Sequence, residues 1–286
     1  MLTQARDREG VLAALAHDRV RAFTLRNFAT LGEEEHLPRM LVDDEAAPSV
    51  LMVHRGASFM ALGAIERLIG AMADLREGRV EQDGGWPDEE TQVDWERDKR
   101  RYLFINSSPY MVWRAALIGG FEPHPDSRGG TVAYLWHIHG EPRFRHLVQH
   151  PCRLGDGAEL LDEMRQGIGY DPEGEYVRLC LEHGPSFVCE VEGRKVCWSC
   201  THLNGTMGMI YTPEEHRRQG YARSLAAFQI DHMLRRDGIA CAHVIDHNVA
   251  SMSLVRFFGA ERLQEPVVWR AVYWPGEAPA PEHAAG

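Results

Sequence analysis

The residues with the clearest potential for chemistry lie in the segment Pro213–Ala226, where an expected strand ends and an expected helix begins. Three arginines surround two residues with little or no side chain: Arg217, Arg218, Gly220, Ala222 and Arg223. The first turn of a helix has unpaired backbone N–H groups and the positive end of the helix dipole, and phosphates bind there. The small residues let a pyrophosphate approach the backbone. The segment therefore predicts an anion site, although it matches neither GxxxxGK[ST] nor GxGxxG.

Two other patterns could hold a metal or carry redox chemistry. Cys197 and Cys200 have CxxC spacing, but their neighbours predict a strand, in which residues three apart point to opposite faces. His137 and His139 would share one face of a strand, and no third ligand follows at a clear spacing. We therefore expect packing roles for both pairs, no metal, and six reduced cysteines.

The elements around the arginine segment predict a mixed α/β fold with one sheet. Three strands are expected first, at 186–191, 196–202 and 206–212. Tight turns at Glu192–Gly193 and Leu203–Gly205 would join them as hairpins. A helix, a strand, a second helix and a last strand then follow, at 220–236, 239–245, 248–258 and 267–273. Gly238 is expected to cap the first of these helices.

The preceding part of the chain gives less regular signals. Its expected elements are helical periodicity over 1–30, short strands within 38–64, a helix at 61–75, an exposed excursion at 76–97, strands at 102–106 and 131–139, and helices at 111–118 and 158–166. These signals favour an N-terminal α/β domain over 1–155 and a second domain over 156–275. Residues 276–286 are rich in Ala, Pro and Glu and read as a disordered tail.

The charge balance and hydropathy exclude some partners. The 286 residues carry a formal net charge of −11, which disfavours non-specific binding to nucleic acid. No apolar run is long enough to span a bilayer, and charged residues follow the first five residues where a signal peptide would be apolar. We therefore expect a cytoplasmic protein without nucleic-acid or membrane partners. A homodimer is compatible with this expectation.

The arginine segment resembles motif A of the GNAT acetyltransferase superfamily, whose signature is Arg/Gln-x-x-Gly-x-Gly/Ala. A strand precedes the segment and a helix follows it, as that motif requires. The stretch from Asp246 to Ala260 resembles motif B of the same superfamily. Four residues occupy matching places in it: Asn248, Ser251, Leu254 and Gly259. Ala260 replaces the usual Phe. The resemblance implies an acyl-CoA-binding α/β domain with a mixed sheet flanked by helices.

Within that superfamily, the C-terminal domain of glycine N-acyltransferase is similar in spacing and identity between Val196 and the Arg217 loop. Enzymes of this kind have an N-terminal domain related to the same fold. The resemblance implies that the pantetheine arm binds backbone groups of Met209, Ile210 and Tyr211. It implies that the pyrophosphate binds around Arg217, Arg218, Gln219, Gly220, Tyr221, Ala222 and Arg223. It also implies that Asn248 and Ser251 line the coenzyme A channel.

The positions that would carry catalysis depart from the pattern. Glycine N-acyltransferases carry a glutamate, the proposed base, where this chain has Thr206, and a threonine cannot act as a base near neutral pH. Many GNAT enzymes place a tyrosine acid where this chain has Val255. Three readings stay open. His243 could be the base and Tyr211 the acid, water could carry the proton while orientation supplies the rate, or the domain could bind acyl-CoA without turnover.

The leading hypothesis is an N-acyltransferase that moves an acetyl or larger acyl group from coenzyme A to a small primary amine, such as an amino acid. It needs acyl-CoA as a substrate and no metal. One alternative is a non-catalytic acyl-CoA-binding regulatory module. Another is acetylation of protein amines, because the acidic chain would attract basic substrates.

Overall fold

The computed structural model describes residues 3–14, 19–29, 39–44, 46–48, 50–55, 58–63, 103–107, 122–123, 131–167, 175–264 and 267–273. These residues belong to two compact units. The first unit contains 1–133 and 265–286, and the second contains 134–264. The boundary expected after residue 155 falls inside the second unit, and the last strand of the chain belongs to the first.

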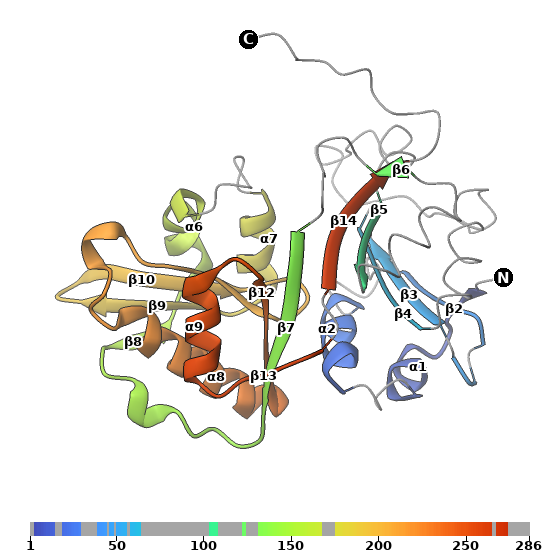
Figure 1. The fold of residues 1–286 in the computed structure, drawn as a ribbon, viewed down its shortest axis with the longest axis horizontal. Helices are drawn as coiled ribbons and strands as arrows, with labels where there is room; N and C mark the ends of the chain where they lie inside the picture. Colours follow the sequence, from blue (N-terminus) through green and yellow to red (C-terminus); the bar gives the residue numbers. More distant parts are fainter. Residues whose placement is uncertain are drawn as a thin grey trace, which may run out of the picture. The chain divides into compact units, whose positions relative to one another are not determined.

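The first unit is built from strands with two helices packed on them (Figure 1). Its described elements are β1 Thr3–Gln4, α1 Arg8–Ala14, α2 Arg19–Ala29, β2 Arg39–Val42, β3 Val50–Arg55, β4 Ser58–Gly63, β5 Leu103–Ser107, β6 Glu122–Pro123 and β14 Val267–Tyr273. Strands β1 to β4 pair in order as antiparallel neighbours. Strand β5 lies parallel to β4, and β14 pairs with the other edge of β5.

The second unit has a mixed sheet in the order β7-β12-β11-β10-β9-β8, with β13 on β7. Its elements are β7 Thr131–His139, which begins in the first unit, η3 Arg145–Leu147, β8 Cys152–Leu154, α6 Gly157–Gly167, α7 Glu175–His183, β9 Ser186–Val191, β10 Arg194–Thr201, β11 Met207–Tyr211, η4 Glu214–His216, α8 Tyr221–Asp237, β12 Ile239–Ile245, α9 Val249–Phe257 and β13 Glu261–Arg262. Strands β8 to β11 are antiparallel neighbours, and α8 crosses over to make β12 parallel to β11.

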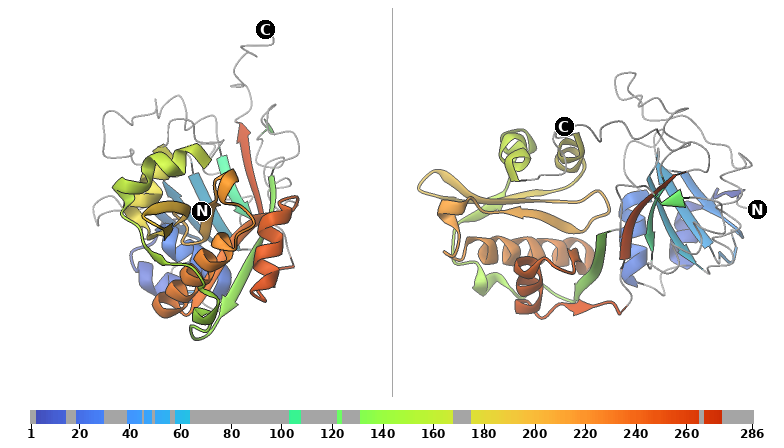
Figure 2. Two further views of the ribbon diagram at one scale, coloured as in Figure 1. Left: turned by 90° about the vertical axis from the view of Figure 1, so that its left-hand side faces the viewer. Right: turned by 45° about the horizontal axis from the view of Figure 1, so that its top comes forward.

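Helices cover both faces of this sheet. In the right-hand view of Figure 2, α6 and α7 lie on one face and α8 lies on the other. The core is divided accordingly. Trp198 and Cys200 of β10 pack with Leu160 of α6, whereas Cys197 packs with Leu225 of α8. The two CxxC thiols therefore lie on opposite faces, as predicted, and none of the six cysteines forms a disulfide.

The tight turns that the sequence predicts are present. Glu192 and Gly193 both have positive φ, 51° and 74°, in the two-residue turn between β9 and β10, as a type I′ hairpin requires. Gly205, with φ 79°, closes the turn before β11. Gly238 has φ 67° and its N–H donates to the carbonyl of Leu234, so it caps α8 as expected.

Most other predicted elements are confirmed with small shifts at their ends. The strands 131–139, 239–245 and 267–273 match to the residue. The prediction did not include α7 or β8. Residues 61–63 belong to β4 instead of beginning a helix. The rest of that expected helix, the excursion at 76–97, the helix at 111–118 and the tail at 276–286 lie outside the described residues.

Candidate functional site

Strands β11 and β12 run parallel but separate along their length. Their register pair is Met207 with Ala242, at the start of β11. On its other side β11 contains a β-bulge, because one extra residue lies between Gly208 and Tyr211 opposite β10. Met209 in the bulge has φ 52°, a left-handed conformation that is uncommon for a residue with a side chain. Among the described residues, β12 therefore leaves the edge of β11 beyond Met207 unpaired. We call this the diverging edge of β11.

Beyond that edge the chain enters α8 through Gly220. Gly220 is the N-cap residue, with φ 87°, and has no side chain to cap the helix. The first helical bond runs from the N–H of Ser224 to the carbonyl of Gly220. The N–H groups of residues 221–223 therefore lack acceptors within the helix, and no capping side chain satisfies them in the described part of the chain. The sequence predicts an anion site at this helix start, which we call the cradle.

Three exposed arginines lie around this helix start. Arg217 is anchored at the end of β11, because its Nε donates to the carbonyl of Thr212 at 3.0 Å. Arg218 occupies the left-handed region, with φ 62°, in the loop itself. Arg223 lies one turn into α8, with its guanidinium 4.1 Å from the ring centroid of Phe257. The cradle thus carries positive charge on solvent-accessible side chains, where a phosphate group can reach it.

The loop before α8 is braced by its own polar groups. The side chain of Gln219 donates to the carbonyl of Glu215 at 3.2 Å and accepts from the hydroxyl of Tyr221 at 3.1 Å. Nε2 of His150 lies 3.1 Å from the carbonyl oxygen of Gln219, and its ring packs against Tyr221 with centroids 4.5 Å apart. These contacts use side chains and a carbonyl, so they leave the backbone N–H groups of the cradle available. Ala222 is partly buried against the core beneath.

Asn248 and Ser251 meet at the start of α9. Oδ1 of Asn248 accepts a hydrogen bond from the backbone N–H of Ser251 at 3.0 Å, so Asn248 is the N-cap of that helix. Asn248 is exposed and Ser251 is partly exposed. The asparagine of the motif B pattern thus has a structural role that does not depend on any ligand.

A buried polar cluster lies at the paired end of β11. Thr206 is fully buried, and both its backbone N–H and its hydroxyl donate to Oδ1 of Asn204, at 3.2 and 2.8 Å. Nδ2 of Asn204 lies 3.4 Å from Nδ1 of His243 on β12. Burial and, to a smaller extent, repulsion from the nearby His202 ring lower the pKa of His243 to about 3. His243 is therefore neutral at physiological pH.

Tyr211 lies at the far end of the bulge, on the face of the sheet covered by α6 and α7. Its ring packs against Trp198, with centroids 5.5 Å apart, and against the cluster around Leu160. Its side chain is partly exposed. It lies at the other end of β11 from Thr206, so the structure does not bring the two predicted catalytic residues, Tyr211 and His243, into one cluster.

His202 lies beside this site and was missed from the sequence. It follows the last residue of β10, and its ring lies over Gly208 so closely that a Cβ there would overlap the imidazole. Its charge also acts on His243. The sequence signal that could have indicated this role is the position of His202 and Gly208 on either side of the hairpin turn at Gly205.

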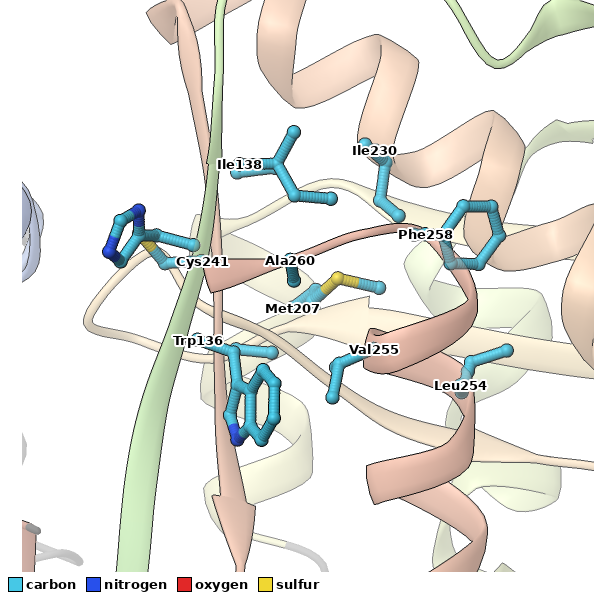
Figure 3. A pocket seen from close by; sticks show the side chains of 12 residues that line it. Trp136, Ile138, Met207, Ile230, Cys241, Leu254, Val255, Phe258 and Ala260 are labelled. Atoms are coloured by element: carbon cyan, nitrogen blue, oxygen red, sulfur yellow. The ribbon is translucent and has the colours of Figure 1, made fainter. Parts of the chain in front are cut away.

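A mostly apolar pocket lies behind the paired end of β11, between the sheet and helices α8 and α9 (Figure 3). Met207 and Ala242, the register pair, both line it, as does Val255 at the position expected for a tyrosine acid. Trp136 also lines the pocket and is buried, and its indole N–H has no acceptor among the described residues. Val255 thus contributes to packing in this chain.

The structure also places the two histidines of β7. The rings of His137 and His139 lie on one face, with centroids 4.9 Å apart. In the described part of the chain, no group of three or more His, Cys, Asp or Glu side chains is arranged to hold a metal ion. The same residues include no helix that is both long and apolar enough to cross a bilayer.

The chain is similar to known proteins both in part of its sequence and in its fold. Residues 188–269 match the model of the FR47-like protein family. A Drosophila protein of known structure is 12% identical, with a TM-score of 0.62 over 95% of this chain and 97% of that one. A tandem GNAT protein from the clavulanic acid biosynthesis pathway is 10% identical, with a TM-score of 0.53 over 95% and 97%. A GCN5-related N-acetyltransferase from Kribbella flavida is 13% identical, with a TM-score of 0.52 over 93% and 96%.

No curated protein matches the sequence significantly. At the identities found for the solved structures, the likeness establishes the fold, and the mixed α/β prediction is confirmed. The diverging strand pair, the bulge and the glycine-led helix start are thus features of a chain with the fold of the GNAT N-acetyltransferases, whose residues 188–269 are similar to the FR47-like family.

Proposed function

We propose that this protein is an acyl-CoA-dependent N-acyltransferase that moves an acetyl or larger acyl group to a primary amine of a small molecule. The observation that carries the proposal is the start of α8. Gly220 leaves the first N–H groups of the helix without a capping side chain, and three exposed arginines lie beside them. A ligand that binds both the helix start and the diverging edge of β11 needs an anionic group for the first and an extended, amide-bearing arm for the second. Coenzyme A has both, as a pyrophosphate and a pantetheine arm.

The arm of the donor would lie along β11. Backbone groups of Met209, Ile210 and Tyr211 lie beyond the register pair and are oriented by the bulge. They would pair with the amides of the pantetheine arm as a neighbouring strand would. The pyrophosphate would bind the N–H groups of residues 218–223, and Asn248 with Ser251 would border the other side. The thioester would then lie near Gly208, at the paired end of the strand.

The acceptor would approach from the face covered by α6 and α7, because the opposite face behind Met207 is filled by apolar side chains. An amino acid is the acceptor favoured by the resemblance to glycine N-acyltransferase. A primary amine in its neutral form can attack the thioester carbonyl, and the coenzyme A thiol leaves.

A thiol-release assay with acetyl-CoA and longer acyl-CoA species tests this function against a panel of amino acids, simple amines and basic peptides. Amine-dependent thiol release with small amines supports the proposal. Release with basic peptides alone would instead support acetylation of protein amines. Failure to bind any coenzyme A species in calorimetry would reject the site itself.

A second function is favoured by two specific residues. Thr206 and Val255 are both buried and occupy the positions where a base and an acid were expected. A protein of this kind could bind acyl-CoA as a regulatory module without turnover. Binding in calorimetry without amine-dependent thiol release would identify this case.

We also infer that the first unit is a second, reduced copy of the same fold, because its strands β1 to β5 repeat the pairing of β8 to β12. A cytoplasmic location is a further proposal. It is supported by six thiols without a disulfide, four of them from β9, β10 and β12 in the core. Whether the protein forms a homodimer can be tested by sedimentation.

A further inference from the structure

We propose that the imidazole of His202 accepts the proton of the attacking amine, a role that rests on the acyl transfer proposed above. The residue stands next to the strand on which the thioester would lie, and nothing in the resemblance to known enzymes assigns it a function.

The backbone around His202 is fixed by the turn that leads into β11. Its N–H donates to the carbonyl of Thr206 at 2.8 Å, and its carbonyl accepts from the N–H of Gly205 at 2.8 Å. The ring then covers Gly208, where any Cβ would overlap it. Glycine at position 208 is therefore what allows an imidazole to lie against the backbone of β11.

The ring lies on the face of the sheet that α6 and α7 cover. Met207 faces the pocket between α8 and α9, and successive residues of a strand point to opposite faces, so position 208 faces α6 and α7. Met209, on the other side of the bulge, also packs on the α6 and α7 face. The imidazole thus lies over Gly208, the first residue of the diverging edge of β11, where bond formation is proposed.

His243, on β12, cannot take the same role because its Nδ1 faces the amide nitrogen of Asn204. Oδ1 of Asn204 accepts both hydrogen bonds from Thr206, so the amide nitrogen of Asn204 faces Nδ1 of His243 as a donor. Nδ1 therefore accepts and carries no proton, and the neutral ring carries its proton on Nε2. Burial also lowers the pKa of His243 to about 3, which makes it a poor base near neutral pH.

In the proposed step, the amine loses one proton to His202 as it gains the acyl group. The lone pair of the neutral amine forms a C–N bond to the thioester carbonyl carbon while His202 takes one proton from that nitrogen. The tetrahedral intermediate then collapses, and the C–S bond breaks with its electron pair on sulfur. The thiolate gains a proton and His202 returns its proton to solvent, so an amide and free coenzyme A are the products.

The test uses His202→Ala in the full chain, with His183→Ala as a matched control, since His183 is an exposed histidine at the end of α7. We expect acyl-CoA affinity in calorimetry to be unchanged and kcat for amine-dependent thiol release to fall by about 10²-fold or more. We expect added imidazole to restore part of the lost rate, because the space over Gly208 is vacated by the ring. A merely structural role would not give imidazole rescue.

A second variant keeps the test decisive if His202→Ala is poorly folded by circular dichroism. His202→Gln keeps a polar side chain beside Gly208 but cannot take up a proton near neutral pH, and we expect the same loss of kcat with acyl-CoA binding retained. Wild-type turnover in a folded His202→Ala variant would overturn the role of His202 alone. A wild-type protein that binds acyl-CoA but acylates no amine would overturn the transfer reaction, and the role of His202 with it.

Discussion

The two units share a strand arrangement and differ at one strand pair. In both units, four antiparallel strands are followed by a strand parallel to the fourth. In the first unit the parallel pair β4–β5 holds three register pairs: Ser58–Phe104, Phe59–Ile105 and Met60–Asn106. Strand β3, the hairpin partner of β4, pairs with it without a shift in register. In the second unit β11 contains a bulge and keeps the single register pair Met207–Ala242.

The difference indicates that the order and direction of the strands do not by themselves produce a diverging edge. It depends on the extra residue in β11 and on the left-handed backbone of Met209 that accommodates it. A continuously paired strand offers no free backbone groups to a ligand at its edge, whereas a diverging strand does. We therefore propose that the ligand binds to the second unit, and the following predictions test where the pairing of β11 with β12 ends and where the proposed site begins.

The largest effect is expected at the closed end of the β11–β12 pair. Thr206→Glu introduces a carboxyl at a position where no part of the side chain is exposed and where both polar groups already pair with Asn204. A buried carboxyl without a partner should lower the free energy of unfolding by about 3 kcal/mol or more. Urea denaturation followed by circular dichroism measures this, with Thr206→Ser as the control. Wild-type stability together with faster thiol release would instead show that this position can hold the base.

The next largest effect is expected at the start of α8, which lies beyond the diverging edge of β11. Gly220→Glu places a negative charge and a side chain in the cradle, and we expect coenzyme A affinity to fall at least about 100-fold, or about 2.7 kcal/mol. Gly193→Glu is the matched control. Gly193 also has positive φ, 74°, so the backbone strain is similar, but it lies in an exposed hairpin turn with open space around it. Equal affinities of the two variants in calorimetry would show that the cradle is misassigned.

His243, which follows the register pair on β12, should make the free energy of unfolding depend on pH. The pKa of His243 is lowered from 6.5 to about 3 in the folded chain, so the unfolded chain binds more protons between these values. Stability must then rise with pH across this window and fall on acidification. Between pH 7 and pH 5 we expect wild type to lose about 2 kcal/mol more than His243→Gln in urea denaturation. Parallel pH curves for the two proteins would contradict burial of a neutral imidazole here.

The smallest effect concerns the border of the site at α9. Asn248→Ala removes the side chain that caps the helix, and we expect the free energy of unfolding to fall by about 1 kcal/mol. Asn248→Ser keeps an oxygen that can accept the N–H of Ser251, so its stability should stay near that of wild type. If both variants lose coenzyme A affinity while only the first loses stability, Asn248 also contacts the ligand.

Local sequence signals were sufficient for most of the elements of the second unit and for the position of the glycine-led helix start. Strands β12 and β14 are bounded by turn residues, and Gly220 stands between a strand and a helix, so each can be placed without tertiary information. The bulge at Met209 could not be predicted, because nothing about a methionine indicates a left-handed backbone. The position of His202 over Gly208 is a contact between strands. The helix α7 lies between a glycine-rich stretch and a proline, and its nine residues repeat the helical period too few times to distinguish it from other short apolar segments.

The bulge also has a consequence for how this chain tolerates changes of length. Met207 faces α8 and α9, Met209 and Tyr211 face α6 and α7, and Ile210 faces α8 again. A deletion of Met209 would restore regular alternation and leave the residues on either side of it facing the same helices as before. The fold should therefore tolerate this deletion better than the diverging edge does, and the number of residues in this short strand is itself a heritable determinant of the site.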